Sequence, residues 1–396
     1  PTEFAFKLPA LVAAFFTGIG AVFLLRRWFK PNIAILASII IITTGQFLFV
    51  SQAGTGAITY ILWPIWLLLS ATMITTSPHH KRFWKLLFFI ILPLSLYSPL
   101  GIYLAIAICS AGLLHPHIRH VLKLVSPLHL FLLTSISLSI LAPLIYLTFI
   151  NPELLFSLLG APTAWPPNII ENLQVLSQQY FNFILPQSGT LITPVLGLGS
   201  IILILLGAWQ QFTIRYTARS YTLVAWIALL LPVLAINPKL TSVAFVPLLL
   251  LLASGLSYIL RFWYDMFPLN PYARFVGVIP LTILVFGLVI SGVDRYFDGY
   301  RYDPVTASSF YHDVSLYNEH INNKNINKLV VTDKERPFYL ALISYDDTPP
   351  LILSVTPSEG EFAATRDAHK LIDLVPTKII TTATNEDSDR FYIYKK

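Results

Sequence analysis

Charged side chains are scarce in this sequence. Asp, Glu, Lys and Arg make up only 12% of its 396 residues, whereas 55% of the residues are hydrophobic, and the mean hydropathy is +0.68. A soluble protein of this size could not remove so much apolar surface from water. The composition therefore predicts an integral membrane protein. The single cysteine, Cys109, excludes an intrachain disulfide.

The sequence motifs of common soluble enzymes are also absent. The chain has no Gly-rich phosphate loop and no GxSxG, CxxC or HExxH motif. Its apolar stretches contain almost no charged residue, which argues against an ion-coupled transporter, since such proteins need ionisable groups at mid-depth. A group of histidines (His79, His80, His115, His117 and His120) stands beside basic residues without a carboxylate. These histidines could bind a metal, but we interpret them as facing lipid headgroups. The sequence therefore requires no cofactor, and a divalent metal is possible but not indicated.

What the sequence has in abundance is apolar stretches long enough to cross about 30 Å of hydrocarbon. We predict ten transmembrane spans, at residues 8–25, 33–51, 57–75, 83–97, 99–114, 128–150, 190–208, 220–236, 240–260 and 275–293. The fourth and fifth spans are short and meet at residues 97–99, where either two spans or a re-entrant pair fits the pattern. Prolines inside several spans favour broken helices around a cavity.

Basic residues are distributed unevenly between the loops. Before residue 294, twelve Lys and Arg fall on one side of the predicted membrane, against only Lys7 and Lys239 on the other. Because basic loops face the cytoplasm, we predict that Pro1, the 151–189 loop and the C-terminal part lie outside, at the cell membrane. The net charge of +6 thus reflects topology, and nucleic acid is not an expected partner. An external Pro1 predicts an odd number of spans upstream of it, most simply one helix followed by an external loop.

Beyond residue 293 the chain changes character. Residues 294–396 hold 16 acidic and 12 basic residues, and short strands (328–332, 351–355, 378–382, 391–394) alternate with helical stretches (306–322, 337–343, 366–374). We therefore predict two domains, an all-α transmembrane bundle at 1–293 and a small extracytoplasmic α/β domain at 294–396. The acidic residues of the second domain, Glu335 among them, are interpreted as a solvated surface without a catalytic role.

Several short motifs occur in an order that resembles a known family. They are Phe4–Pro9 (FAFKLP), Arg26–Phe29 (RRWF), Gln46–Thr55, Leu96–Tyr103 (LYSPLGIY), Glu171–Leu173 (ENL) and Asn237–Lys239 (NPK). In this order the chain resembles the GT-C membrane glycosyltransferases, in particular the protein O-mannosyltransferase and aminoarabinose transferase branch. The resemblance covers most of the chain. Many members carry an acidic residue where this sequence has Gly54–Gly56 (GTG), so the subfamily stays open.

The resemblance implies transfer of a sugar from a polyprenyl-phosphate-linked donor, at the outer face of the membrane, to a lipid, glycan or protein acceptor. It also implies that the general base is an Asp of the first external loop, which the alignment places upstream of Pro1. Glu3, Glu153 and Glu171 are weaker candidates for this base. A transfer that inverts the anomeric carbon needs such a base, and it needs a cation to stabilise the leaving lipid phosphate.

Two lysines are candidates for holding that phosphate. Lys7 and Lys239 each begin a predicted span from the outside, so both are expected at headgroup depth, where an ammonium group can bind a phosphate. The alternative for each is a snorkelling lysine without a ligand.

The 151–189 loop contains no Lys or Arg but holds aromatic residues, including Trp165 and Tyr180. These aromatics are interpreted either as part of an interfacial belt or as a lid over the acceptor and the sugar. An O-antigen ligase or polymerase would need arginines in such a loop. A non-enzymatic polytopic protein, either a transporter or a lipid-handling scaffold, is the alternative from another class, and an Asp in an upstream external loop would decide against it.

Overall fold

The computed structural model describes residues 3–76, 80–123, 126–162, 165–181, 196–213, 217–301, 306, 310, 313–321, 326, 328–344, 352–356, 360–381 and 390–395. The chain forms two compact units. A helical unit comprises Ala10–Asp303, and a small α/β unit combines Pro1–Pro9 with Pro304–Lys396. The division falls after the helical turn η3 (Arg295–Tyr300), which follows α15 (Val278–Asp294) without a break.

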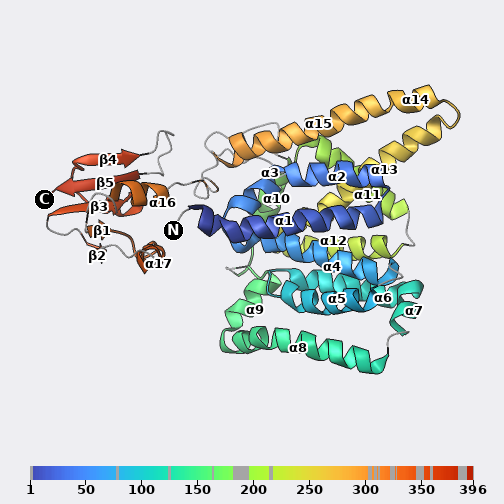
Figure 1. Ribbon diagram of the computed structural model, residues 1–396, viewed down its shortest axis with the longest axis horizontal. Helices are drawn as coiled ribbons and strands as arrows, with labels where there is room; N and C mark the ends of the chain where they lie inside the picture. The colour runs from blue at the N-terminus through green and yellow to red at the C-terminus, as the bar shows by residue number, and fades with distance from the viewer. Residues whose placement is uncertain are drawn as a thin grey trace. The chain divides into compact units, whose positions relative to one another are not determined.

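The first half of the helical unit consists of α1 (Glu3–Trp28), whose first residues belong to the α/β unit, α2 (Pro31–Thr43), α3 (Gly45–Gln52), η1 (Gly56–Ile58), α4 (Thr59–Thr76), α5 (Lys81–Ser95), α6 (Gly101–Leu114), α7 (Pro116–Lys123) and α8 (Pro127–Ile150). The second half consists of α9 (Pro152–Leu159), α10 (Ile169–Phe181), α11 (Leu198–Thr213), α12 (Ala218–Ile236), η2 (Pro238–Ala244), α13 (Phe245–Met266), α14 (Pro271–Val276), α15 and η3. In Figure 1, α7 and α14 mark one end of this helical unit, and α3 and α9 mark the other end.

Six helices among the described residues are long and apolar enough to cross a membrane, or seven if the bent pair α2 and α3 counts as one span. Every predicted stretch is mostly helical where it is described, but ten spans are not confirmed. The remaining three predictions correspond to α5, α6 and α11, which have 15, 14 and 16 residues. A helix of 15 residues is only about 22 Å long, shorter than the hydrocarbon layer. Residues 190–195 of the seventh prediction lie outside the described residues.

The helix α13 forms the centre of the helical unit. Its first thirteen residues, Phe245–Ser257, are all buried except the half-buried Leu248, whereas only 6% of the hydrophobic window of α8 is buried inside the protein. The neighbour α11 approaches α13 closely at two glycines. A Cβ atom at Gly207 would lie 1.9 Å from the carbonyl oxygen of Leu251, and one at Gly255 would lie 1.9 Å from that of Leu203. Only glycine therefore permits this crossing, as at other close contacts between membrane helices.

The bend between α2 and α3 is 56° and occurs at Thr44, whose backbone is extended. Here the chain passes the C-terminal end of α15 at close range. A Cβ atom at Gly45 would lie 3.0 Å from the carbonyl oxygen of Gly292, and one at Gly292 would lie 2.3 Å from that of Thr43. The absence of side chains at these two glycines therefore lets the bent pair pack against α15.

The α/β unit contains a five-stranded sheet with the strand order β2-β1-β3-β5-β4. The strands are β1 (Lys328–Val330), β2 (Ile352–Ser354), β3 (Glu361–Thr365), β4 (Lys378–Thr381) and β5 (Arg390–Lys395), and the helical segments are α16 (Asp313–Leu316), η5 (Tyr317–Ile321), α17 (Arg336–Ser344) and α18 (Arg366–His369). β1 is parallel to β2 and β3, whereas β5 is antiparallel to β3 and β4. The prediction of a mainly helical protein with a small C-terminal sheet is thus confirmed.

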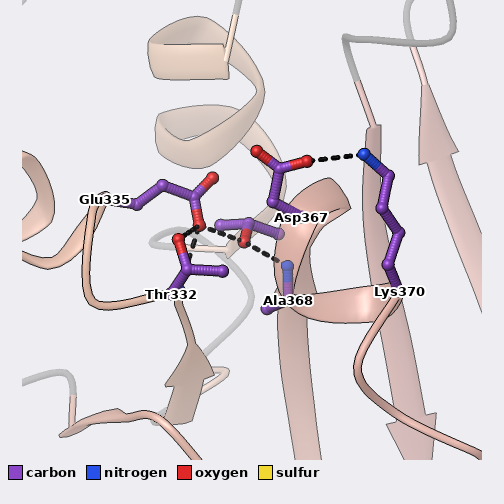
Figure 2. A network of polar contacts seen from close by, with 6 residues as sticks. Thr332, Glu335, Asp367, Ala368 and Lys370 are labelled. Atoms are coloured by element: carbon purple, nitrogen blue, oxygen red, sulfur yellow. Dashed lines mark hydrogen bonds and ion pairs between the residues drawn. The ribbon is translucent and has the colours of Figure 1, made fainter. Parts of the chain in front are cut away.

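Glu335 is the centre of a polar network that joins β1, β3 and α18 (Figure 2). Its carboxylate accepts hydrogen bonds from the backbone N–H of Thr332 (3.0 Å), the hydroxyl of Thr332 (2.8 Å) and the hydroxyl of Thr365 (2.8 Å). Thr332 and Glu335 lie in the turn just before α17, where the backbone N–H of Glu335 donates to the carbonyl oxygen of Thr332 (3.1 Å). Thr365 caps α18 by accepting from the N–H of Ala368 (3.3 Å). The interpretation of Glu335 as a solvated surface acid was therefore wrong, because tertiary contacts bring Thr365 to it.

Candidate functional site

The candidate site lies at the end of the helical unit that carries α9 and α10, the end predicted to face outside. At this end α12 stops at Asn237, and Asn237 begins η2. The side chain of Asn237 accepts from the N–H of Lys239 (3.3 Å) and donates to the carbonyl oxygens of Gly160 (3.4 Å) and Ala161 (3.3 Å). One amide side chain thus joins the loop after α9 to the junction of α12 and η2.

Gly160 permits this junction because of its backbone conformation. It ends α9 with a φ of +82°, in the left-handed region that favours glycine. A Cβ atom there would lie 2.5 Å from Cδ2 of Leu100 and 2.7 Å from Cγ1 of Val233. Gly160 is therefore enclosed by the start of α6 and the end of α12, and the neighbouring carbonyl of Leu159 accepts from the hydroxyl of Tyr103 (2.9 Å).

Lys239 is exposed at the start of η2, as expected for a residue at the beginning of a span. Its backbone is held by Asn237, while its ammonium group forms no ion pair within the described residues. An exposed ammonium on a fixed backbone can accept an anionic ligand without first losing another partner.

Helix α10 covers the same junction from the other side. The side chain of Asn172 donates to the carbonyl oxygen of Ile236 (2.7 Å), and the hydroxyl of Tyr180 donates to the backbone carbonyl oxygen of Thr241 (3.5 Å). Burial raises the pKa of Tyr180 far above its ordinary value, so this phenol stays protonated and acts as a donor. The described part of the 151–189 loop contains the two helices α9 and α10. Tyr180 attaches α10 to η2 through its hydrogen bond to Thr241. Residues 182–189 lie outside the described residues.

The second aromatic of the predicted lid, Trp165, is placed differently. Its side chain is 74% exposed, and among the described residues it makes no ring contact with Tyr180. The structure therefore does not bring the two predicted lid residues together. Their roles toward an acceptor remain predictions.

The predicted carboxylates have unequal surroundings. Glu171 accepts from the side-chain amide of Asn168 (3.1 Å) while its own N–H donates to that side chain (3.3 Å), which is a cap at the start of α10. Glu153 is exposed in the first turn of α9. The side chain of Glu3 lies outside the described residues, although its backbone begins α1. Of the two described side chains, that of Glu153 is less engaged in local structure than that of Glu171.

Lys7, the second predicted phosphate ligand, lies in the part of α1 that belongs to the α/β unit, whereas Lys239 belongs to the helical unit. Lys7 is half-buried. The structure thus assigns the two predicted lysines to different units.

The sequence analysis missed another cation at this end of the helical unit, Arg295. It follows α15 and is half-buried, and a Cβ atom at Gly197 would lie 3.3 Å from its guanidinium. A Cβ atom at Gly45 would lie 3.1 Å from its Cβ, which places it beside the bend between α2 and α3. The helical span that contains α15 continues to Tyr300, beyond the apolar stretch that ends at residue 293, so only the structure assigns Arg295 to the helical unit.

Metal binding has no support among the described residues, where no three His, Cys, Asp or Glu side chains are grouped to hold an ion. Of the histidines singled out from the sequence, His115 lies edge-on to Tyr221, with ring centroids 6.1 Å apart, and His120 is exposed. His79 and the side chain of His117 lie outside the described residues.

Comparisons with known proteins rest on the fold. No protein family and no curated protein matches the sequence. A structure comparison matches the crystal structure of ArnT from Cupriavidus metallidurans in the apo state, with a TM-score of 0.53 over 98% of this chain and 83% of that chain. The chain shares its fold with ArnT. The sequence identity is 13%, so the match shows the fold alone.

The match to ArnT bears on the resemblance seen in the sequence. The order of weak motifs pointed to the protein O-mannosyltransferase and aminoarabinose transferase branch of the GT-C membrane glycosyltransferases, and ArnT is an aminoarabinose transferase of the GT-C family. The predicted resemblance is therefore confirmed at the level of the fold. A fold alone does not establish a reaction, so a reaction has to be argued from the residues at the end of the helical unit that carries α9 and α10.

Proposed function

We propose that this protein is a membrane glycosyltransferase of the GT-C type, which transfers a sugar from a polyprenyl-phosphate-linked donor to a lipid, glycan or protein acceptor at the outer face of the membrane. The observation that carries the proposal is the ArnT-like fold over 98% of the chain. The apolar helices supply a membrane domain in which a lipid-linked donor can be held.

The chemistry needs two kinds of group. A base takes the proton of the acceptor as its oxygen or nitrogen bonds to the anomeric carbon, and the lipid phosphate leaves with the electron pair of the broken C–O bond. A cation near that phosphate stabilises the charge that develops on it. We propose Lys239 and Lys7 for the phosphate, and Arg295 as a further cation of the same end of the helical unit as Lys239. Glu153 is the first carboxylate to test as the base, because Glu171 is engaged in a cap.

The junction around Asn237 supports the assignment of Lys239. Its contacts with Gly160 and Ala161 fix the start of η2, so the exposed Lys239 ammonium extends from an ordered backbone at the predicted headgroup level. A charge-assisted contact to a phosphate contributes about 1.5–3 kcal/mol, and about 1.4 kcal/mol corresponds to a factor of ten in affinity.

The first prediction is that Lys239→Gln weakens binding of polyprenyl phosphate to the full-length protein in nanodiscs by about tenfold or more. Lys239→Arg should retain part of the affinity, because the charge remains while its geometry changes. Lys81→Gln, which removes an exposed lysine at the other end of the helical unit, serves as the control and should leave the affinity unchanged.

Turnover of the sugar donor tests the proposed glycosyltransferase activity separately from the proposed role of Lys239. The full-length protein should release polyprenyl phosphate from a polyprenyl-phosphate sugar when an acceptor is supplied. Unaltered affinity in Lys239→Gln with turnover intact would contradict the role of Lys239 and favour Lys7. A protein that neither binds polyprenyl phosphate nor releases it would contradict the enzyme itself and favour a non-enzymatic membrane protein.

A further inference from the structure

A cavity of about 520 Å³ lies at the opposite end of the helical unit from the candidate glycosyl-transfer site. It is formed where α1, α11 and α13 end and α12 begins, and the basic loops predict that this end faces the cytoplasm. In Figure 1 the same end carries α7 and α14. The proposed transfer reaction does not use this cavity.

Three cations line the cavity, Lys30, Arg219 and Arg261, and its lining includes no Asp or Glu. Lys30 and Arg261 are exposed at its edge, and neither forms an ion pair within the described residues. Asp265 lies one turn beyond Arg261 on α13 but does not line the cavity. A concentration of positive charge with no carboxylate to neutralise it attracts an anion.

Arg219 is held in place by the end of α1. Its guanidinium donates to the carbonyl oxygens of Trp28 and Arg27, the latter at 3.1 Å, and it lies over the Trp28 ring at 5.7 Å from the centroid. These bonds use two of its N–H groups and leave the others for a ligand. The group is thus fixed before any ligand arrives, which reduces the entropy lost on binding.

The uncharged wall of the cavity is a chain of hydrogen bonds across three helices. The hydroxyl of Ser220 donates to Gln211 (2.6 Å), and the amide of Gln211 donates to Ser254 (2.8 Å). Thr217 caps α12 by accepting from the N–H of Ser220 (3.2 Å). The first turn of α12 therefore faces the cavity region with its positive dipole end, which also favours an anion.

One buried polar atom in the lining has no partner among the described residues. Gln210 is only 9% exposed, and its Oε1 makes no hydrogen bond. A buried acceptor without a donor lowers stability unless a ligand or water supplies one. A ligand that carries a hydroxyl or ammonium group beside its negative charge would satisfy Gln210 and the cations together.

We propose that this cavity binds a phosphate group with an adjacent hydroxyl or ammonium donor, such as a glycerol phosphate group. Arg219, Lys30 and Arg261 would hold the phosphate, and Gln210 would accept from the donor. The source of this group is either the headgroup of a phospholipid in the facing leaflet or a soluble phosphate ester. A second cavity of about 250 Å³ adjoins it across Trp28 and Arg219 and has apolar residues in its lining, which is compatible with an acyl chain.

The second prediction tests this site by native mass spectrometry of the full-length protein in detergent. The probes are dioctanoyl phosphatidylglycerol, dioctanoyl phosphatidylcholine, which has no headgroup donor, and glycerol 3-phosphate. We expect phosphatidylglycerol to bind more tightly than phosphatidylcholine, and the double variant Lys30→Gln/Arg261→Gln to lose about tenfold or more in affinity. Arg26→Gln removes a charge from the same end but outside the cavity lining and should bind as the unaltered protein does.

The outcomes separate the sources of the phosphate. Binding of phosphatidylglycerol alone, with the loss in the double variant, supports a lipid ligand. Charge-dependent binding of glycerol 3-phosphate supports a soluble ligand in the same site. Gln210→Leu, which removes the orphaned acceptor, should reduce the preference for phosphatidylglycerol over phosphatidylcholine even if the double variant fails to fold. Equal affinity in the double variant and in Arg26→Gln, or no binding of any probe, would overturn the proposal.

Discussion

Single side chains in this protein often act by joining elements that are distant in the sequence. Asn237 connects η2 to the loop after α9, Arg219 connects the start of α12 to the end of α1, and Glu335 connects β1 to β3. Each uses a polar side chain to satisfy backbone or hydroxyl groups that the fold would otherwise leave unpaired. These residues are therefore expected to matter for local order before they matter for any reaction.

The third prediction concerns Glu335. Glu335→Ala leaves the two threonine hydroxyls and one N–H without their acceptor, so the α/β unit should lose about 1–3 kcal/mol of stability. Hydrogen exchange measured by mass spectrometry should show faster exchange in α17 and α18. Glu335→Gln keeps one acceptor oxygen and should have a smaller effect, and Glu361→Ala, which alters an exposed acid on β3, should have none. Unchanged protection in Glu335→Ala would show that the network is not a stabilising one.

At the scale of elements, glycines decide which helices approach closely. Gly207 and Gly255 bring α11 against α13, and Gly45 and Gly292 bring the bent pair α2 and α3 against α15. In each case the atom nearest to the missing Cβ is a backbone carbonyl oxygen, which cannot rotate away as a side chain can. The helix pairs that enclose the core therefore depend on these positions.

The fourth prediction is that Gly207→Ala strongly destabilises the helical unit, because its new Cβ would lie 1.9 Å from the carbonyl oxygen of Leu251. Separating the helices to relieve this overlap should cost about 1–3 kcal/mol or more. The thermal unfolding midpoint in detergent should fall accordingly. Gly287→Ala on α15 is the matched control, since a Cβ there meets nothing within 4 Å. Equal midpoints for the two variants would contradict the described helix crossing.

The whole molecule combines a helical membrane unit with an α/β unit, and its fold is shared with ArnT. The two proposed ligand sites lie at opposite ends of the helical unit, Lys239 at one and Arg219 at the other. The orientation of the helical unit in the membrane decides which of the two sites faces the cytoplasm and which faces outside. It therefore decides which ligands can reach each site.

The fifth prediction is therefore the orientation itself. In a Cys109→Ser background, a cysteine at Ser157 in α9 should react with a membrane-impermeant thiol reagent added to intact cells, because the basic loops place that end outside. A cysteine at Ser126, before α8, should react only after permeabilisation. Both serines are exposed, so accessibility within the protein is matched. Reaction of the Ser126 position in intact cells would reverse the topology.

Hydropathy and charge along the sequence alone determined the membrane character, the places of the apolar helices and the presence of a small C-terminal sheet, because a hydrocarbon solvent demands long apolar helices whatever their neighbours are. Strand β3 was missed, because its sequence EFAAT has little β-branched content and is stabilised by pairing on both sides. Only the tertiary structure decided the hydrogen-bond network around Glu335, the place of Arg295 and the cavity at Arg219. These features arise from contacts between residues far apart in the chain, which no local pattern records.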